Sequence, residues 1–163
     1  LRIVNGGHIN ISKMTGSWAG AMGQCQFMPS SFINYATDWD KDGSKDIWTS
    51  KPDVFASAAN YLKRVGWSNK ITWGRKVFIG NFNDKIDEKK YNLLSYWAAK
   101  GILKANKDKL PNVKVKARLI IPDGYKNYGY LAYKNFDSLL NWNRSNYFAI
   151  AVGTLADSIK DNN

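Results

Sequence analysis

Several residue types that carry enzyme chemistry are nearly missing from this sequence of 163 residues. It has one cysteine, Cys25, which excludes an intrachain disulfide and a cysteine-based zinc site. His8 is the only histidine, and its neighbours Gly6 and Gly7 form no pattern typical of Ser-His-Asp or Cys-His catalysis. Glu88, the only glutamate, lies in a run of charged residues that favours its solvated, ionised form. The usual nucleophilic and acid–base arrangements therefore lack a complete set of residues.

Long apolar runs are also missing, because none reaches the roughly 18–20 residues that span a bilayer. The chain begins with Leu1 rather than Met, so we expect a processed or shortened piece, and a missing leader then says nothing about export. Hydrophobic residues make up 44%, with seven Trp, nine Tyr and seven Phe, which predicts a folded domain with a real core. Flat aromatic rings also suit stacking against sugars, although most large aromatics simply fill cores.

The net charge of +11 is concentrated in the middle of the chain. Residues 68–134 carry 15 basic and five acidic residues, a balance of +10, against +2 for residues 1–67 and −1 for residues 135–163. Such a segment attracts polyanions: nucleic acid, anionic lipid, or a cell wall that bears carboxylates. Charge alone does not choose among them. No nucleic-acid-binding motif accompanies the lysines, so we expect no nucleic-acid partner.

Helix signals occur at both ends of the chain. A short helix before Gly6-Gly7, a helix starting near Pro29 and a helix capped by Ser50 are expected in the first 67 residues. Later helices are expected over residues 87–100 and from Ser145 to about residue 160. The spacing predicts three inward stripes: Val54, Ala58, Leu62 and Val65; Tyr91, Leu94 and Ala98; and Phe148, Ala151, Val152, Leu155 and Ile159.

Strand-like composition is confined to residues 76–82, 113–121 and 128–133. Lys114 and Lys116 alternate with apolar residues, which predicts a half-exposed strand, and Pro122-Asp123-Gly124 predicts a turn. The fold class expected is α+β. We expect three parts: residues 1–67 as part of a mainly helical core with an acidic loop, residues 68–134 as a small basic β-containing subdomain, and residues 135–163 as a C-terminal helix that completes the core.

The acidic loop has the spacing of a calcium loop. Carboxylates occupy loop positions 1, 3, 5 and 9, with Gly43 at position 6; they belong to Asp38, Asp40, Asp42 and Asp46. Position 12 is Thr49, which cannot supply the bidentate carboxylate of a strong site. The pattern favours either weak calcium binding or an acidic turn that satisfies its own hydrogen bonds.

Three stretches together resemble the membrane-bound lytic murein transglycosylase B family. They are GSWAGAMGQCQFMPSSF at residues 16–32, DWDKDGSKDIW with SAANYLKRVGW at residues 38–67, and NWNRSNYFAIAVGTLAD at residues 141–157. The resemblance implies a lysozyme-like fold. It also implies cleavage of the β-1,4 bond between N-acetylmuramic acid (MurNAc) and N-acetylglucosamine (GlcNAc) in peptidoglycan, with closure of a 1,6-anhydro ring on the muramyl product. One Glu then acts as acid and as base, in place of the usual carboxylate pair.

The resemblance also implies which residues form the glycan-binding groove. Ser17 and Gln26 match positions that bond sugars or place the catalytic carboxyl. The further substrate-binding residues that it implies are Met22, Phe27, Tyr61, Trp142, Asn143 and Tyr147. Many relatives have Tyr-Asn where this chain has Trp142-Asn143, so a role that needs a phenolic hydroxyl at this position is in doubt.

In the family the catalytic Glu lies upstream of the first stretch, whereas Glu88 lies far downstream. We therefore expect no catalytic residue in this chain, and little or no lytic activity from it alone. The alternative is a non-catalytic module that binds or scaffolds peptidoglycan. The expected partners are peptidoglycan glycan strands, with membrane association through a segment beyond this sequence. We expect a periplasmic or cell-envelope location, and no required cofactor apart from weakly bound calcium.

Overall fold

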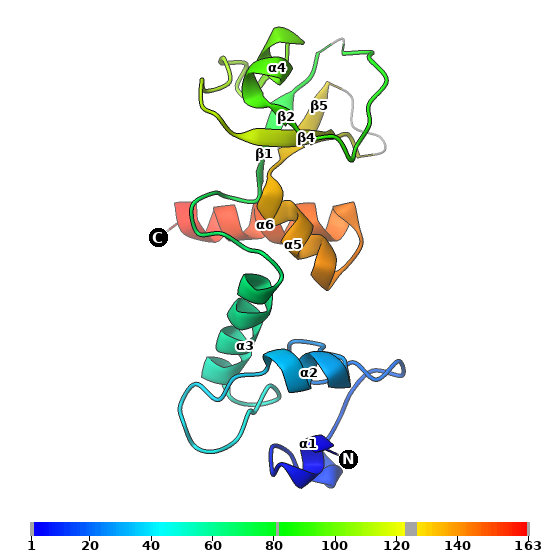
Figure 1. Cartoon of the computed structure of the whole chain (residues 1–163), viewed down its shortest axis with the longest axis vertical. Coiled ribbons are helices and arrows are strands. Elements are labelled where there is room, and N and C mark those ends of the chain that lie inside the picture. Colours follow the sequence, from blue (N-terminus) through cyan, green and yellow to red (C-terminus); the bar gives the residue numbers. More distant parts are fainter. Residues whose placement is uncertain (1, 81, 123–126, 163) are drawn as a thin grey trace. The chain divides into compact units, whose positions relative to one another are not determined.

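The computed structural model describes residues 2–80, 82–122 and 127–162, so the turn expected at Pro122-Asp123-Gly124 lies mostly outside the described residues. The chain forms two compact units, Leu1–Gly66 (the N-terminal unit) and Trp67–Asn163 (the C-terminal unit). They run from blue to green and from green to red in Figure 1. The division falls beside the boundary expected at residue 67. That residues 135–163 complete a lysozyme-like core stays a prediction.

In its described residues the N-terminal unit contains three α-helices and one 3-10 helix, and local residues set the starts of α2 and α3. They are α1 (Arg2–Asn5), the 3-10 helix η1 (Ile11–Lys13), α2 (Pro29–Tyr35) and α3 (Lys51–Arg64). Pro29 occupies the first turn of α2, where a missing N–H costs no helical hydrogen bond. Ser50 caps α3 by accepting a hydrogen bond from the Asp53 N–H. The helix starts expected near Pro29 and after Ser50 are confirmed.

The buried side of α3 is polar, so the inward apolar stripe was predicted wrongly for this helix. Asp53 and Ser57 are 1% and 0% exposed, whereas the stripe is only half-buried; it comprises Val54, Ala58, Leu62 and Val65. The reason is that Asp53 and Ser57, one helical turn apart, accept hydrogen bonds from the backbone of the preceding loop. Thr37 N–H donates to Ser57 Oγ at 2.9 Å, and Trp39 N–H donates to Asp53 at 2.7 Å.

The C-terminal unit is built on a five-stranded antiparallel sheet in the order β2-β4-β5-β1-β3 (Figure 1). The strands are β1 (Gly74–Phe78), β2 (Asn92–Leu93), β3 (Leu103–Lys104), β4 (Lys116–Ile120) and β5 (Tyr128–Ala132). Phe78 lies opposite Tyr128 and Gly74 opposite Ala132, which fixes the central register. The three expected strands are therefore present, with shifted bounds.

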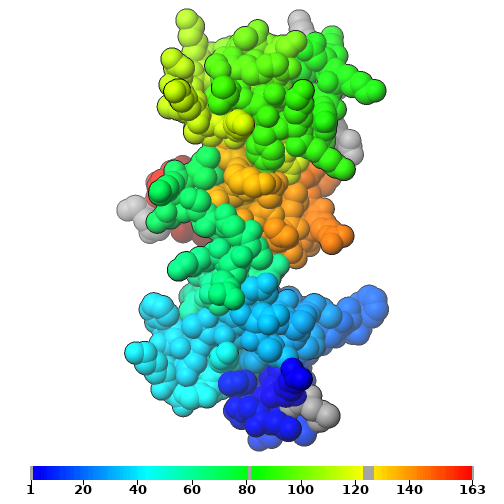
Figure 2. All heavy atoms as spheres, in the orientation of Figure 1, coloured from blue at the N-terminus to red at the C-terminus, as the bar shows by residue number. Residues whose placement is uncertain are grey.

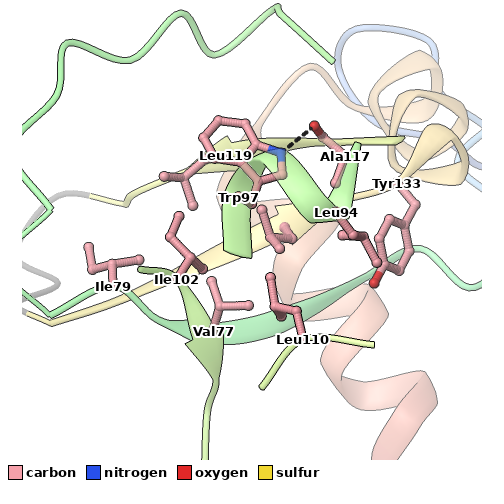
Figure 3. Packing of buried hydrophobic residues seen from close by; sticks show 10 residues of the cluster. Val77, Ile79, Leu94, Trp97, Ile102, Leu110, Ala117, Leu119 and Tyr133 are labelled. Carbon is pink, nitrogen blue, oxygen red and sulfur yellow. Dashed lines mark hydrogen bonds between the residues drawn. The ribbon is translucent and has the colours of Figure 1, made fainter. Parts of the chain in front are cut away.

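One face of the sheet packs against α4 (Leu94–Ala99) and the loops around it. Figure 3 shows Val77, Leu119 and Leu94 in this apolar cluster with Trp97. The Trp97 indole Nε1–H donates to the Ala117 carbonyl at 2.9 Å, so its one polar atom is satisfied inside the core.

Helix α4 is shorter than the helix predicted over residues 87–100. Leu94 and Trp97 are buried, but Ala98 is exposed, and half-buried Tyr91 lies before the helix. The prediction was wrong because the segment before α4 pairs with the sheet: Asn92 and Leu93 form β2 beside β4. Local periodicity gave no sign of that pairing.

Strand β4 is not the half-exposed strand that the lysine alternation predicted. Lys114 precedes the strand, and the residues from Ala117 to Ile120 are all buried. The sheet is covered on both faces here, so even Arg118 is 6% exposed. Its guanidinium donates to the Glu88 carbonyl at 2.8 Å and pairs with Asp137 at 3.3 Å, which offsets the cost of burying a charge.

Helices α5 (Lys134–Trp142) and α6 (Asn146–Asp161) follow the sheet. Ser145 Oγ caps α6 by accepting from Phe148 N–H, as expected. The face predicted to point inward is wrong, because the buried residues are Ala149, Ile150 and Gly153. Of the predicted stripe, Phe148 is half-buried, and the exposed members are Ala151, Val152, Leu155 and Ile159.

The packing of Trp73 determines which face of α6 is buried. Its indole lies directly over Gly153, where a Cβ would approach Trp73 Cγ to 2.8 Å. Its Nε1–H donates to Asp157 Oδ2 at 2.9 Å, one turn further along α6.

Among the described residues, no helix is both long and apolar enough to cross a membrane.

Candidate functional site

The N-terminal unit has an open pocket of about 1030 Å³. Its wall is formed by residues from three segments, 7–17, 23–26 and 46–49. The second and third segments lie close together because Gly23, at φ +61°, has its backbone against Ile47: a Cβ there would meet the Ile47 carbonyl oxygen at 2.5 Å. Gln24 N–H also donates to the Ile47 carbonyl at 2.8 Å. The first segment is joined to the third by the Trp48 indole Nε1–H, which donates to the Thr15 carbonyl at 3.0 Å.

Gln26 reaches this pocket in a strained conformation. Its φ of +49° lies in the left-handed region, which costs a residue with a Cβ about 1–2 kcal/mol. The tight turn behind it requires this backbone: Gln26 N–H donates to the Gly23 carbonyl at 3.1 Å, and its Nε2 donates to the same oxygen at 2.9 Å. The side chain is exposed on the pocket wall, which leaves its amide oxygen and second N–H for a ligand.

Ser17 lines the same pocket on a second tight turn. Ser17 N–H donates to the Ala21 carbonyl at 2.8 Å, and Ala21 N–H donates back to Ser17 Oγ at 3.1 Å. The hydroxyl is thereby held in place as an acceptor, and its own proton points to no acceptor within the described part of the chain. A serine hydroxyl with one lone pair used retains a donor and an acceptor for a sugar hydroxyl or acetamide.

Trp48 is a pocket residue that the sequence did not single out. Its ring lies 5.7 Å from Phe32, and its Nε1–H donates to the Thr15 carbonyl at 3.0 Å. Gln24 Nε2 donates to the Trp48 carbonyl at 2.8 Å, so the residue is fixed from both sides. Residues 47–49 form a turn, and no pattern in the sequence indicated that this turn contributes to the pocket wall.

His8 lines the pocket as well, but it is bound to the acidic loop. Its Nδ1 accepts from Lys45 N–H at 3.3 Å, and its carbonyl accepts from the Ser44 hydroxyl at 3.1 Å. The ring packs 5.6 Å from Phe32. These contacts describe a residue that joins the loop to the pocket wall.

The lining that the structure describes contains one carboxylate, Asp46, and it is unsuited to act as a general acid. Burial alone would raise the pKa of Asp46, but hydrogen bonds from the Thr49 side chain and from the backbone N–H groups of residues 48–50 lower it overall. A carboxyl that delivers a proton near neutral pH needs a raised pKa. Asp46 therefore stays ionised at neutral pH and does not carry a proton to deliver there.

Two other titratable groups in this chain have surroundings that disfavour acid or nucleophile roles. Burial raises the pKa of the Cys25 thiol to about 11, so the nucleophilic thiolate is scarce at neutral pH. Glu88 is exposed in the C-terminal unit, where its Oε2 accepts from Asn146 Nδ2 at 3.4 Å.

Of the predicted groove residues in the N-terminal unit, only Ser17 and Gln26 line the pocket. Met22 and Phe27 are 4% and 3% exposed, and their backbones exchange two hydrogen bonds of 2.8 and 3.0 Å. Tyr61 is half-buried, with its ring 5.7 Å from Phe27. These three support the turn that carries Gln26, and a direct sugar contact from them stays a prediction.

The three remaining groove residues lie where α5 ends and α6 begins. Trp142 is the half-buried last residue of α5. Asn143 is exposed, and its Oδ1 accepts from Ser145 N–H at 3.1 Å. Tyr147, in the first turn of α6, is 55% exposed. A shared sugar contact from these three residues stays a prediction.

The acidic loop converges as the spacing predicts. Carboxylate oxygens of Asp38, Asp40 and Asp42 lie within 4.8 Å of one another. Asp38 Oδ1 is buried without a hydrogen-bond partner, while its Oδ2 accepts from Gly43 N–H at 3.0 Å. Asp46 points away from this group, into the turn at residues 48 and 49. The three converging carboxylates fit a hard cation such as calcium, and the fourth expected ligand does not join them.

Comparison with known proteins places these features in a family. Residues 1–157 match the family described as the transglycosylase SLT domain. The chain belongs to this family. It is 33% identical over 155 residues to the membrane-bound lytic murein transglycosylase B of Escherichia coli (strain K12), in a match that covers 90% of this chain and 40% of that protein. The resemblance predicted from the three sequence stretches is thereby confirmed.

Solved structures of transglycosylases confirm the lysozyme-like α+β fold. SltB3 from Pseudomonas aeruginosa, in complex with NAG-anhNAM-pentapeptide, has a TM-score of 0.91 and 40% identity, covering 98% of this chain and 44% of that one. The Escherichia coli lytic transglycosylase Slt35, in complex with calcium, has a TM-score of 0.73 and 32% identity, covering 90% and 46%. This transglycosylase domain therefore spans less than half the length of these relatives.

Proposed function

We propose that this chain binds peptidoglycan glycan strands as part of a lytic transglycosylase that cleaves between MurNAc and GlcNAc. The observation that carries the proposal is the strained, exposed Gln26 beside Ser17 on the wall of a large pocket. Backbone strain persists only where its surroundings enforce it, and it gathers at functional sites. The family membership supplies the class of ligand.

The pocket has the chemistry that an amino sugar requires. N-acetyl groups present an N–H donor and a carbonyl acceptor, which Gln26 and Ser17 can meet with an amide and a hydroxyl. Trp48 supplies a flat apolar ring for one face of a sugar. A pocket of about 1030 Å³ is at the upper end of ordinary ligand sites, as an extended glycan needs.

Cleavage to a 1,6-anhydro product would need an acid at the glycosidic oxygen and a base at the C6 hydroxyl. Among the described pocket residues, Asp46 is held ionised and Glu88 is absent. We therefore propose that this chain by itself binds glycan without cleaving it. The same observation favours the alternative, a non-catalytic peptidoglycan-binding module. The two proposals differ only in whether polypeptide beyond this sequence supplies an acid.

Replacing Gln26 tests the proposal because stability and binding should move in opposite directions. Gln26→Gly relieves the left-handed strain and should raise the free energy of unfolding by about 1 kcal/mol. It also removes the amide, and affinity for glycan strands should fall about five- to tenfold, the effect of one or two hydrogen bonds. Thermal melts and titration with peptide-free NAG–NAM oligosaccharides measure the two effects.

Gln26→Asn is the matched control, because asparagine tolerates the left-handed region and keeps an amide. It should stay stable and lose less affinity than Gln26→Gly. A Gln26→Gly protein that gains stability and binds glycan as the parent does would remove Gln26 from the site.

We propose that the acidic loop binds calcium weakly through Asp38, Asp40 and Asp42. The support is the unpartnered, buried Asp38 Oδ1 beside two further carboxylates, together with a similar structure that was determined with calcium. Calcium at 5 mM should raise the melting temperature by a few degrees, since a ligand of the folded state stabilises it. Asp38→Asn should abolish the rise. An unchanged melting temperature in calcium and in chelator would contradict the site.

We propose a location in the bacterial cell envelope, with the basic segment 68–134 facing the anionic wall or membrane surface. The support is the local balance of +10 and the murein-active family. Residues 82–116, coloured green to yellow-green, form a broad face of the C-terminal unit in Figure 2. The name of the Escherichia coli relative describes it as membrane-bound. For this chain, attachment to a membrane stays a proposal.

A further inference from the structure

A second pocket, of about 240 Å³, lies in the C-terminal unit and shares no lining residue with the first. It forms where the loop at residues 82–90 passes beside α4. Its apolar wall comes from Phe82, Tyr96 and Trp97, and Tyr96 is 45% exposed. The Tyr96 and Trp97 rings meet edge to face at 5.1 Å.

The pocket is held in shape by contacts on each side. The Trp97 indole is fixed by its hydrogen bond to Ala117, and Phe82 packs against the buried core cluster. Asp84 pairs with Lys100 at 2.6 Å, which ties the loop to the end of α4. Such a site needs little reorganisation before a ligand enters.

The rim of the pocket carries charges of both signs. Lys85 and Lys90 are exposed ammonium groups, while Asp84 and Asp87 supply carboxylates. Because Asp84 is already paired with Lys100, the lysines at the rim leave a local excess of positive charge. A fitting ligand has an apolar body, N–H groups for the carboxylates and a carboxylate of its own for the lysines.

The size of the pocket limits the ligand. About 240 Å³ is below the roughly 300–1,000 Å³ of sites for drug-sized molecules, so it suits one or two amino-acid residues rather than a disaccharide. We propose that this pocket binds the free carboxylate end of a short peptide, with the apolar side chain against Phe82 and Tyr96 and the carboxylate on Lys85 and Lys90.

The proposal rests on the proposed function for the source of the peptide. A peptidoglycan strand carries peptide stems that end in a carboxylate, and the SltB3 complex contains a pentapeptide attached to its sugars. The second pocket would then disfavour stems that have donated their terminal carboxyl to a crosslink, since those stems have no free carboxylate end.

The experiment titrates the full chain with a sugar-free stem pentapeptide, followed by the NMR signal of the Trp97 indole N–H. We expect saturable binding. Lys90→Glu should raise the dissociation constant about tenfold, because it reverses a charge-assisted contact. Lys89→Glu is the control: it makes the same change of charge one residue away, outside the pocket lining, and should change the constant less than twofold.

Two further variants separate ring stacking and the terminal carboxylate. Tyr96→Ala should weaken binding about fivefold, whereas Tyr96→Phe should bind as the parent does. A pentapeptide with an amidated C-terminus should lose about as much affinity as Lys90→Glu costs. Absence of saturable binding, equal binding of the amidated peptide, or equal effects of Lys89→Glu and Lys90→Glu would each overturn the proposal.

The same titrations distinguish this site from the glycan pocket. Binding of the free pentapeptide without binding of peptide-free NAG–NAM oligosaccharides would overturn the proposed glycan function and retain the peptide site. The reverse result would overturn the peptide site alone.

Discussion

Replacing Asp53 by alanine is expected to lower the free energy of unfolding by about 2–4 kcal/mol. Asp53 is 1% exposed, and its two carboxylate oxygens accept from Trp39 N–H at 2.7 Å and Asp46 N–H at 2.8 Å. Alanine leaves both partly buried N–H groups without their carboxylate partner, and each unsatisfied buried group costs about 1–3 kcal/mol. The acidic loop then loses its attachment to α3.

Denaturant unfolding in the presence of chelator measures the Asp53→Ala effect without any contribution from calcium. Asp40→Ala is the matched control: it removes an exposed carboxylate of the same loop whose hydrogen bonds, to Asp42 N–H and Ser50 Oγ, are both 3.4 Å long. It should cost less than about 1 kcal/mol. Equal losses from the two variants would show that burial of Asp53 has no special role.

Replacing Gly153 by alanine is expected to destabilise the C-terminal unit by about 1–3 kcal/mol. Within an exposed helix the same change stabilises by about 1 kcal/mol. The sign reverses here because the new Cβ would overlap the Trp73 indole, with Cγ at 2.8 Å. The hydrogen bond from Trp73 Nε1 to Asp157, one turn along α6, is expected to be lost with the packing.

Thermal unfolding followed by tryptophan fluorescence reports the Gly153→Ala effect. The neighbouring exposed Thr154 provides the control, since Thr154→Ala leaves the Trp73 contact intact and should change stability by less than about 0.5 kcal/mol. A Gly153→Ala protein as stable as the parent would mean that α6 does not pack on Trp73 as described.

The contrast between helix starts and helix faces explains what the sequence could predict. Pro29, Ser50 and Ser145 act within three residues of themselves, so each helix start was readable. The buried face of α6 depends on Trp73 and Gly153, which are 80 positions apart, and the stripe of apolar residues therefore gave the wrong face. Only the folded chain reveals such a contact.

The residues of the candidate site, like the helices, could be predicted from the sequence only in part. Ser17 and Gln26 followed from the resemblance, and both line the pocket. The positive φ of Gln26 could not be predicted, because glutamine has no preference for that region and the turn around Gly23 imposes it. Trp48 was missed because its place on the wall depends on hydrogen bonds to Thr15 and Gln24, which lie far away in the sequence.

The central claim is that the N-terminal pocket binds an amino-sugar strand. The most direct test titrates the whole chain and its Gln26→Gly variant with peptide-free NAG–NAM oligosaccharides. Mass spectrometry of the same samples follows the release of product. The account predicts saturable binding by the parent, binding about five- to tenfold weaker by the variant, and no 1,6-anhydro product from either. No binding by the parent, or equal binding by the two proteins, would contradict it.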